Sequence, residues 1–186
     1  MVTTTETTEI ITEPKNQQQV QPSLKRWFKH FLYMPASKRY FNKQDQFAIA
    51  QAVTRAEEGH VGEIQVVIEG HMPCSQAYYH DTNLRAQQLF AELGVWDTEQ
   101  NSGVLLYLNL CEQKVEIVID RGIKQATEQV DWQNICDQIV SDLKNKKYKE
   151  GVVAGVTQIG TILNRYYDHQ FDDESNELTN QPIILN

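Results

Sequence analysis

The sequence predicts an α/β fold, a three-layer α/β/α sandwich in which helices cover both faces of a short mixed β-sheet. Three runs of strand length and strand composition lie at 63–69, 103–110 and 114–120. Segments with helical periodicity precede, separate and follow these runs. The run at 103–110 is nearly all apolar, as expected of a central strand that is covered on both faces.

Composition indicates one globular domain. The chain has 186 residues, of which 40% are hydrophobic and 23% are charged, enough to bury one sizeable core. Its formal net charge of −8 argues against nonspecific nucleic-acid binding. The scattered Cys74, Cys111 and Cys136 form neither a disulfide framework nor a zinc motif. The start does not resemble a signal peptide and no run is long enough to span a bilayer, so we expect a cytoplasmic protein without a transmembrane segment.

Two segments precede the predicted domain. Residues 1–22 are rich in Thr, Glu and Gln, and we expect a disordered tail. Residues 23–36 form a basic, aromatic, amphipathic segment. Its apolar side chains recur at helical spacing: Leu24, Trp27, Phe28, Phe31 and Leu32. This stripe can lie on an anionic membrane surface or dock onto the domain, and we expect docking because such stripes usually mark buried faces.

The domain itself is expected over 37–168. Asn42 is a suitable N-cap for its first helix, and Gly59 is placed to end that helix in a left-handed conformation. A second helix is expected from about 76 to 93, after the first strand. Two further helices, from about 124 and from about 147 to 168, follow the third strand. The acidic residues 169–186 are expected to form a disordered tail.

The lengths of the connections predict the strand directions. The three-residue link 111–113 is too short for a parallel crossover, so the second and third strands form an antiparallel hairpin. The first strand reaches the second through a helix, which suits a parallel right-handed crossover. These directions bring the starts of the first two strands and the end of the third to one edge of the sheet.

Polar side chains gather at that edge. The oxygen donors are Glu63, Asp97, Asn101 and Asp120. Carboxylate and amide oxygens are the ligands of calcium, magnesium or manganese. His60 can add a nitrogen, and Arg121 can pair with a carboxylate or a phosphate. Each residue has an ordinary alternative role as a turn former, cap or surface pair, and it is their convergence that predicts a divalent-cation site.

Several stretches resemble the TPM domain family. They are EEGHVGEIQVVIE (57–69), RAQQLFAELGVWDTEQNSGVLLYLNL (85–110), VEIVIDRGI (115–123) and WQNI (132–135). The resemblance covers roughly 37–168 and is strongest to the soluble bacterial branch of the family, which lacks a signal peptide and a membrane helix. It implies an α/β/α sandwich around a short mixed sheet, divalent metal binding near the acidic strand edge, and in some members acid phosphatase activity.

The family motifs map onto individual positions. Asp97, Thr98 and Asn101 match the loop before the central strand, Asp120 and Arg121 match the end of the third strand, and His60 and Glu63 match the lead into the first strand. The chain departs from the family at Ser102, where a second Asn is common. It also departs at YYDHQFD (166–172), where domains of the family usually end in a His-Phe-Pro motif.

Two functions remain open at this stage. In the first, the domain binds calcium or magnesium through Glu63, Asp97, Asn101 and Asp120 and serves as an assembly or interaction module. Its protein partner is unknown and can be membrane-associated. In the second, it is a metal-assisted phosphatase in which His60 or Glu63 transfers protons and Arg121 stabilises charge. No established hydrolase motif specifies the second function, because the sequence contains no Cys-x5-Arg, P-loop, G-x-S-x-G or HExxH pattern. The oligomeric state is open.

Overall fold

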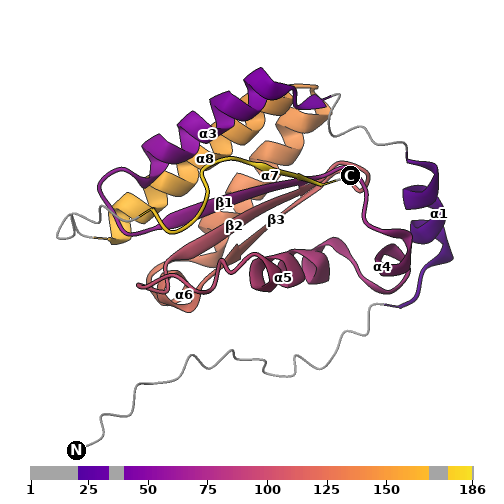
Figure 1. Ribbon diagram of the computed structural model, residues 1–186, viewed down its shortest axis with the longest axis horizontal. Coiled ribbons are helices and arrows are strands. Elements are labelled where there is room, and N and C mark those ends of the chain that lie inside the picture. The colour runs from indigo at the N-terminus through magenta and orange to yellow at the C-terminus, as the bar shows by residue number, and fades with distance from the viewer. Residues whose placement is uncertain (1–20, 34–39, 168–175, 186) are drawn as a thin grey trace, which may run out of the picture.

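The computed structural model describes residues 21–33, 40–167 and 176–185. In chain order its elements are α1 (Leu24–Leu32), α3 (Lys43–Glu57), β1 (Glu63–Glu69), α4 (Cys74–Tyr79), α5 (Thr82–Glu92), β2 (Gly103–Asn109), β3 (Lys114–Ile119), α6 (Arg121–Ala126), α7 (Gln129–Lys144), α8 (Tyr148–Tyr166) and β4 (Ile183–Leu185) (Figure 1). The expected tail at 1–22 lies outside the described residues except for its last two positions.

The sheet has four strands in the order β3-β2-β1-β4. β1 pairs with β2 in parallel, and β2 pairs with β3 in antiparallel register. Both expected strand directions are therefore confirmed. β1 and β2 are buried along their whole length, because each has a strand on both sides and helices on both faces.

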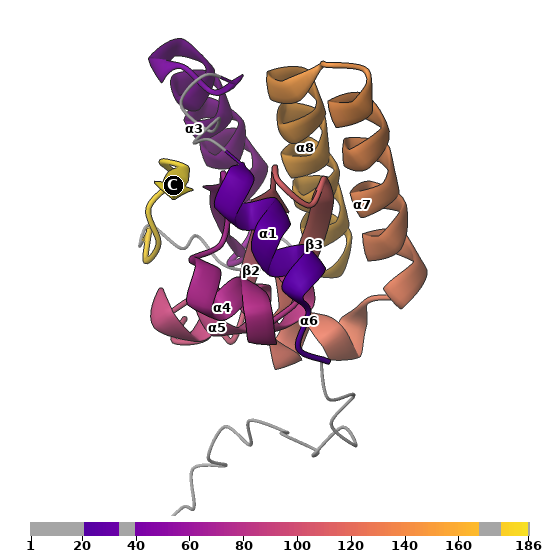
Figure 2. The same cartoon turned by 90° about the vertical axis from the view of Figure 1, so that its right-hand side faces the viewer.

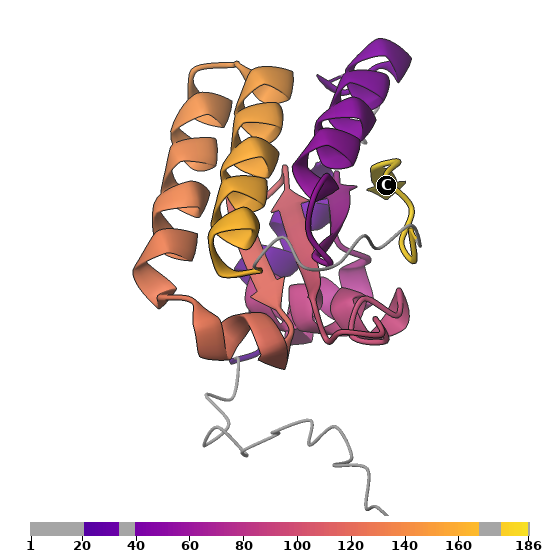
Figure 3. The same ribbon diagram turned by 90° about the vertical axis from the view of Figure 1, so that its left-hand side faces the viewer.

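The helices form layers on the two faces of the sheet. On one face α3, α7 and α8 pack side by side over the larger core, which includes Ile64, Val104 and Ile159. On the other face α5 covers a smaller core around Leu105 and Tyr107. Figures 2 and 3 show these layers from the two ends of the sheet. The α/β/α sandwich predicted from the sequence is confirmed.

The first domain helix begins and ends as expected. The Asn42 side chain accepts hydrogen bonds from the backbone N–H groups of Gln44 and Asp45, and the Asp45 carboxylate accepts the Asn42 backbone N–H. This reciprocal capping box satisfies N–H groups that the helix itself leaves without partners. Gly59 follows the helix with a φ of 86°, in the left-handed region that favours glycine.

The single helix expected at about 76–93 is instead two helices, α4 and α5. The break lies at His80 and Asp81, where the Asp81 carboxylate accepts the Leu84 backbone N–H over 2.9 Å and caps α5. An Asp at this position stabilises a new helix start more than it stabilises a continuous helix. The apolar spacing alone did not reveal the break.

The acidic tail expected at 169–186 is wrong for residues 176–185. Ile183, Ile184 and Leu185 form β4, which pairs in parallel with β1. The backbone N–H of Gly70 also donates to the Leu185 carbonyl oxygen over 2.9 Å. The β-branched residues at the end of the segment favour a strand, although the acids before them dominate its composition.

α1 forms a helix as expected, but four of the five residues of its apolar stripe, all except Trp27, are exposed and not docked onto the domain. His30 is the buried residue of α1, whereas Phe28 and Phe31 are exposed. The polar side chains Arg26, Lys29 and His30 make the hydrogen bonds and ion pairs that join α1 to the domain. Of the stripe residues, Trp27 is half-buried beside α4. Within the described residues, no helix is long and apolar enough to cross a membrane.

A buried polar network lies at the end of β1 nearest α1. The Glu69 carboxylate accepts hydrogen bonds from the Arg85 guanidinium over 2.9 and 3.2 Å, and from the Tyr107 hydroxyl over 2.5 Å. The Asn109 amide donates to the Tyr107 oxygen over 2.8 Å. Each buried charge therefore has an opposite charge or a hydrogen-bonding group beside it, as a stable interior requires.

Candidate functional site

The residues that the sequence placed at one edge do lie at one end of the sheet, which we call the acidic rim. The acidic rim consists of His60, Glu63, Asp97, Asn101, Asp120 and Arg121. Glu63 pairs with Gly103, and the backbone N–H of Asp120 donates to the Gly103 carbonyl oxygen over 2.9 Å. Glu63 and Asp120 therefore flank Gly103. Figure 3 views the molecule from this end, with α6 beside the sheet.

Two close backbone approaches hold the loop 97–102 against the strand ends. A Cβ atom on Gly103 would lie 1.9 Å from the carbonyl oxygen of Val95, and one on Gly122 would lie 2.6 Å from that of Asn101. Only glycine fits at such distances. These two glycines allow the loop before β2 and the start of α6 to pack directly on one another.

Two buried hydroxyl groups stabilise the same loop. The Ser102 hydroxyl donates to the Val61 carbonyl oxygen over 2.6 Å, and the Ser102 backbone N–H donates to the Thr98 hydroxyl oxygen over 2.9 Å. Both side chains are buried and both are bonded to the backbone. Ser102, where the family commonly has Asn, thus ties the loop to the segment before β1.

Asp120 is buried, with 6% of its surface exposed. Its Oδ1 atom accepts the Arg121 backbone N–H over 2.5 Å, so it caps α6, although the sequence analysis had placed it at the end of a strand. Its Oδ2 atom is buried and has no hydrogen-bond partner among the residues that the structure describes. Burial raises the pKa of Asp120, because desolvation disfavours the charged carboxylate.

Tyr167, which follows α8, contributes a phenol that the sequence analysis did not include. Its hydroxyl oxygen is buried and likewise lacks a hydrogen-bond partner within the described ranges. Burial, and then the nearby charge of Asp120, raise the pKa of Tyr167. Its ring centroid lies 6.3 Å from that of His60. The sequence signal for Tyr167 was its place as the second residue of YYDHQFD (166–172), where the chain departs from the family.

The tautomer of His60 follows from its hydrogen bonding. The Gly62 backbone N–H donates to Nδ1 of His60 over 3.0 Å, so in the neutral ring the proton resides on Nε2. A protonated Nε2 offers a hydrogen-bond donor and no lone pair for a metal ion. In the neutral ring, Nε2 of His60 is therefore a hydrogen-bond donor and Nδ1 is an acceptor.

Two acids meet at the start of β1. The Glu63 carboxylate accepts the backbone N–H groups of Glu177 and Leu178, each over 3.3 Å. The Glu57 carboxylate accepts the Ile64 backbone N–H over 2.8 Å. Burial, with a smaller contribution from the negative charge of Glu63, raises the pKa of Glu57 to about 8. The sequence pattern does not reveal Glu57 as a site residue, because it lies in the helix before the strand and its approach to Ile64 depends on how the chain turns between them.

The remaining rim residues lie at the surface. Asp97, Asn101 and Arg121 are exposed, and Asn101 has a φ of 51° in the loop before β2. His60, Glu63 and Asp120 are therefore buried, whereas the other three residues of the acidic rim are exposed at the same end of the sheet.

Among the residues that the structure describes, the one close group of three or more His, Cys, Asp or Glu ligand atoms lies at the opposite end of the sheet from the acidic rim. His30, Cys111 and Glu112 present ligand atoms within 4.8 Å of one another. However, Nδ1 of His30 accepts the Met72 backbone N–H over 3.0 Å, so the proton of the neutral ring is on Nε2. Nε2 of His30 lies 3.1 Å from Oε1 of Glu112, which is close enough for an ion pair. The two atoms are not aligned for a hydrogen bond. Burial raises the pKa of Cys111 to about 11. The cluster fits an anchor between α1 and the hairpin better than a metal site.

Comparisons with known proteins identify a family. A protein-family model described as the TPM domain (TPM_phosphatase) matches residues 36–162, more than half of the 186-residue chain. The match excludes α1 and the segment 176–185. A search of curated proteins found no significant match.

Solved structures of other proteins resemble the chain. The NMR structure of the BA42 protein from the psychrophilic bacterium Bizionia argentinensis is 26% identical, with a TM-score of 0.68, over 77% of this chain and 94% of that one. The NMR structure of the N-terminal domain of a protein from P. gingivalis is 18% identical, with a TM-score of 0.56, over 70% of this chain and 82% of that one. The second likeness concerns the fold alone.

Proposed function

The chain belongs to the TPM domain family, and on this basis we propose that it binds a divalent cation at the acidic rim and acts as an assembly or interaction module. The proposed oxygen ligands are Glu63, Asp97, Asn101 and Asp120, and calcium or magnesium is the ion that such ligands suit. The observation that carries the proposal is the buried Oδ2 atom of Asp120, which meets no partner in the described parts of the chain.

An unpartnered buried carboxylate oxygen is costly. A carboxylate taken out of water destabilises the folded state unless hydrogen bonds or an opposite charge compensate. A cation beside Asp120 would supply that compensation and would lower the raised pKa of its carboxyl group. The same ion would also offset the repulsion between Glu57 and Glu63, which contributes to the raised pKa of Glu57.

The hydrogen bonds of Glu63 are compatible with a ligand role. Each carboxylate oxygen has two lone pairs, so an oxygen that accepts one N–H can still coordinate an ion. Because the two N–H groups come from Glu177 and Leu178, an ion at Glu63 would act on the segment that leads to β4. Cation binding is thus expected to change the order of that segment.

Titration with Ca²⁺ or Mg²⁺, followed by backbone amide shifts, tests the proposal. We expect shifts at 60–63, 97–103 and 120–122 together. The Asp120→Asn variant should abolish them, because Asn keeps the N-cap of α6 but carries no charge. Asp137→Asn, at an exposed position of α7, is the matched control and should titrate as the wild type does. Shifts confined to other regions, or unchanged affinity in Asp120→Asn, would exclude this site.

Metal-assisted phosphomonoester hydrolysis is the second candidate, favoured by the exposed Arg121 guanidinium directly after Asp120 and by the name of the family model. The cation, when bound, would polarise the phosphoryl group. A water molecule would attack phosphorus as the ester P–O bond breaks, and Arg121 would stabilise the developing charge. His60 in its imidazolium form would donate a proton to the leaving oxygen, with Glu63 as the alternative proton carrier.

A chromogenic phosphate ester with and without Mg²⁺ tests hydrolysis. Arg121→Gln is expected to lower kcat by about 10²-fold, because it removes a charge that acts mainly in the transition state. Asp120→Asn should abolish turnover while the far-UV circular dichroism stays unchanged. Turnover that survives in Asp120→Asn would point to a contaminating phosphatase and leave cation binding as the function.

A further inference from the structure

The helix α1 presents an apolar face to solvent. Four of its nine residues are large apolar side chains that are more than half exposed: Leu24 at 68%, Phe28 at 55%, Phe31 at 60% and Leu32 at 68%. Aromatic and aliphatic side chains on a helix of a soluble domain usually face the core. A contiguous exposed apolar surface of this kind marks a site of contact with something outside the domain.

This orientation is fixed by specific polar contacts. The Arg26 guanidinium donates to the carbonyl oxygens of Ala77 and Tyr78 over 2.6 and 3.1 Å, and these carbonyls belong to α4. On the next turn, the buried His30 accepts the Met72 N–H and faces Glu112. The polar face of α1 is therefore held inward by bonds to the domain, and the apolar face is held outward.

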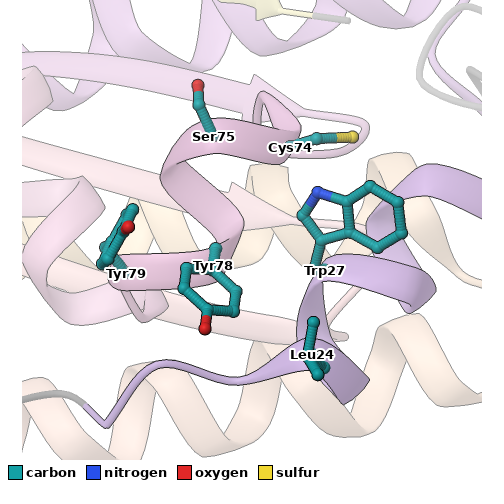
Figure 4. Close-up of a pocket in the computed structure, with 6 residues that line it drawn as sticks. All are labelled: Leu24, Trp27, Cys74, Ser75, Tyr78 and Tyr79. Carbon is teal, nitrogen blue, oxygen red and sulfur yellow. The ribbon is translucent and has the colours of Figure 1, made fainter.

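The apolar surface continues onto α4. Leu24 and Trp27 of α1, with Tyr78 and Tyr79 of α4, line an open cavity of about 350 Å³ that also includes Cys74 and Ser75 (Figure 4). Tyr79 is 59% exposed. Aromatic rings with a polar tip are favoured at the boundary between lipid headgroups and acyl chains.

The helix α1 is basic although the chain is acidic. It contains Lys25, Arg26 and Lys29 and no Asp or Glu, whereas the whole chain has a net charge of −8. Arg26 bonds inward to α4 and Lys29 pairs with Glu112, so Lys25 is the Lys or Arg of α1 whose side chain makes no hydrogen bond or ion pair within the described residues. Lys25 is exposed on α1 next to Leu24. A basic helix with an exposed Leu- and Phe-rich face is complementary to an anionic lipid surface, which attracts the cations and accommodates the apolar side chains.

We propose that α1 docks this protein onto an anionic lipid bilayer, with Leu24, Phe28, Phe31 and Leu32 entering the headgroup boundary and Lys25 facing the lipid phosphates. A second copy of the chain is a less suitable occupant. In a symmetric dimer through α1, the same cations would face one another and repel. α1 lies at the opposite end of the sheet from α6 and the acidic rim, so docking leaves the rim open to solvent (Figure 1).

Sedimentation of the full chain with vesicles tests the proposal. We expect binding to vesicles of equal parts phosphatidylglycerol and phosphatidylcholine, and much weaker binding to phosphatidylcholine alone. Phe31→Ser should lower the partition coefficient about fivefold, since it removes one ring from the buried face. Phe47→Ser is the matched control, because Phe47 is 57% exposed but lies on α3. Lys25→Glu should weaken binding, and raising the salt concentration should do the same.

The outcomes separate the possible occupants of the face. Absence of binding to anionic vesicles, or an equal loss in Phe47→Ser and Phe31→Ser, would overturn the proposal. Self-association in sedimentation velocity that Phe31→Ser removes, without vesicle binding, would assign the face to a second copy of the chain. Asp120→Asn should bind vesicles as the wild type does, so lipid docking and cation binding can fail independently.

Discussion

Glu63 and Glu69, the first and last residues of β1, are both buried glutamates in different surroundings. Glu69 faces the guanidinium of Arg85 and the hydroxyl of Tyr107. Glu63 accepts two long N–H bonds and lies near a second acid, Glu57, whose pKa is raised to about 8. A buried acid paired with a cation of the same chain serves stability, whereas an acid beside a second acid raises the pKa of its neighbour, as at Glu57.

Removing the charge partner of Glu69, at the end of β1 where the buried acid is paired with Arg85, should have the largest effect on stability. Arg85→Met removes the guanidinium and leaves Glu69 buried, so we expect the free energy of unfolding to fall by about 3–5 kcal/mol. Urea denaturation measures this change. Arg55→Met, at an exposed position of α3, is the control and should change stability by less than about 0.5 kcal/mol. A loss in Arg85→Met no greater than in the control would show that the Glu69 network contributes little.

The start of β1, where Glu57 lies near Glu63, should make the stability of the protein depend on pH. The folded state holds the Glu57 proton up to about pH 8, whereas the unfolded state loses it near pH 4.5. The folded state therefore binds more protons in this window, and stability falls as the pH rises through it. Glu57→Gln should remove the slope and gain about 1–2 kcal/mol at pH 8, after allowance for solvent screening of this partly exposed carboxyl.

Thermal unfolding at a series of pH values measures this effect. Glu58→Gln, one residue later and exposed, is the matched control and should retain the wild-type slope. Saturating Ca²⁺ should flatten the wild-type slope, because a bound cation lowers the pKa of the neighbouring acids. A wild-type slope that persists in Glu57→Gln would place the titrating group elsewhere.

A smaller effect on stability is expected where Glu112 holds α1 through His30 and Lys29, at the same end of the sheet as Glu69. The interaction with His30, and then that with Lys29, lowers the pKa of Glu112 to about 2. Its stabilisation is therefore present above pH 4.5 and is lost as the pH falls through 2. Glu112→Gln should cost about 1 kcal/mol at neutral pH.

Hydrogen exchange localises this change. In Glu112→Gln the amides of α1 should exchange faster at neutral pH, while those of α7 stay unchanged. The difference from the wild type should disappear as the pH approaches 2. Glu128→Gln, at an exposed position before α7, is the control and should leave α1 unaffected. Uniform acceleration throughout the chain would indicate global destabilisation instead of a local anchor.

Much of the architecture was predictable because it depends on local signals. Strand composition located β1, β2 and β3, and the contrast between a three-residue link and a full helical crossover determined their directions. The convergence of Glu63 and Asp120 beside Gly103 follows directly from those directions. Their role as ligands is a separate matter and stays a prediction.

The features that were missed depend on three-dimensional context. The periodicity of α1 identifies its apolar face, but not which face the domain will contact, and here Arg26 and His30 decide. The pairing of Glu69 with Arg85 depends on where α5 crosses the sheet. Tyr167 reaches Asp120 only because α8 ends beside the start of α6. None of these contacts between distant parts of the chain can be read from the spacing of residues in the sequence.

The position of β4 has a consequence for biosynthesis. β4 covers the side of β1 that faces away from β2, and the contact between Gln65 and Gln181 joins residues 116 positions apart. During synthesis, the backbone N–H and C=O groups on that side of β1 lack a strand partner until β4 has been made. An open strand flank is prone to pair with other nascent chains. We therefore expect truncation before β4 to lower soluble yield in cells more than it lowers the melting temperature of the purified domain.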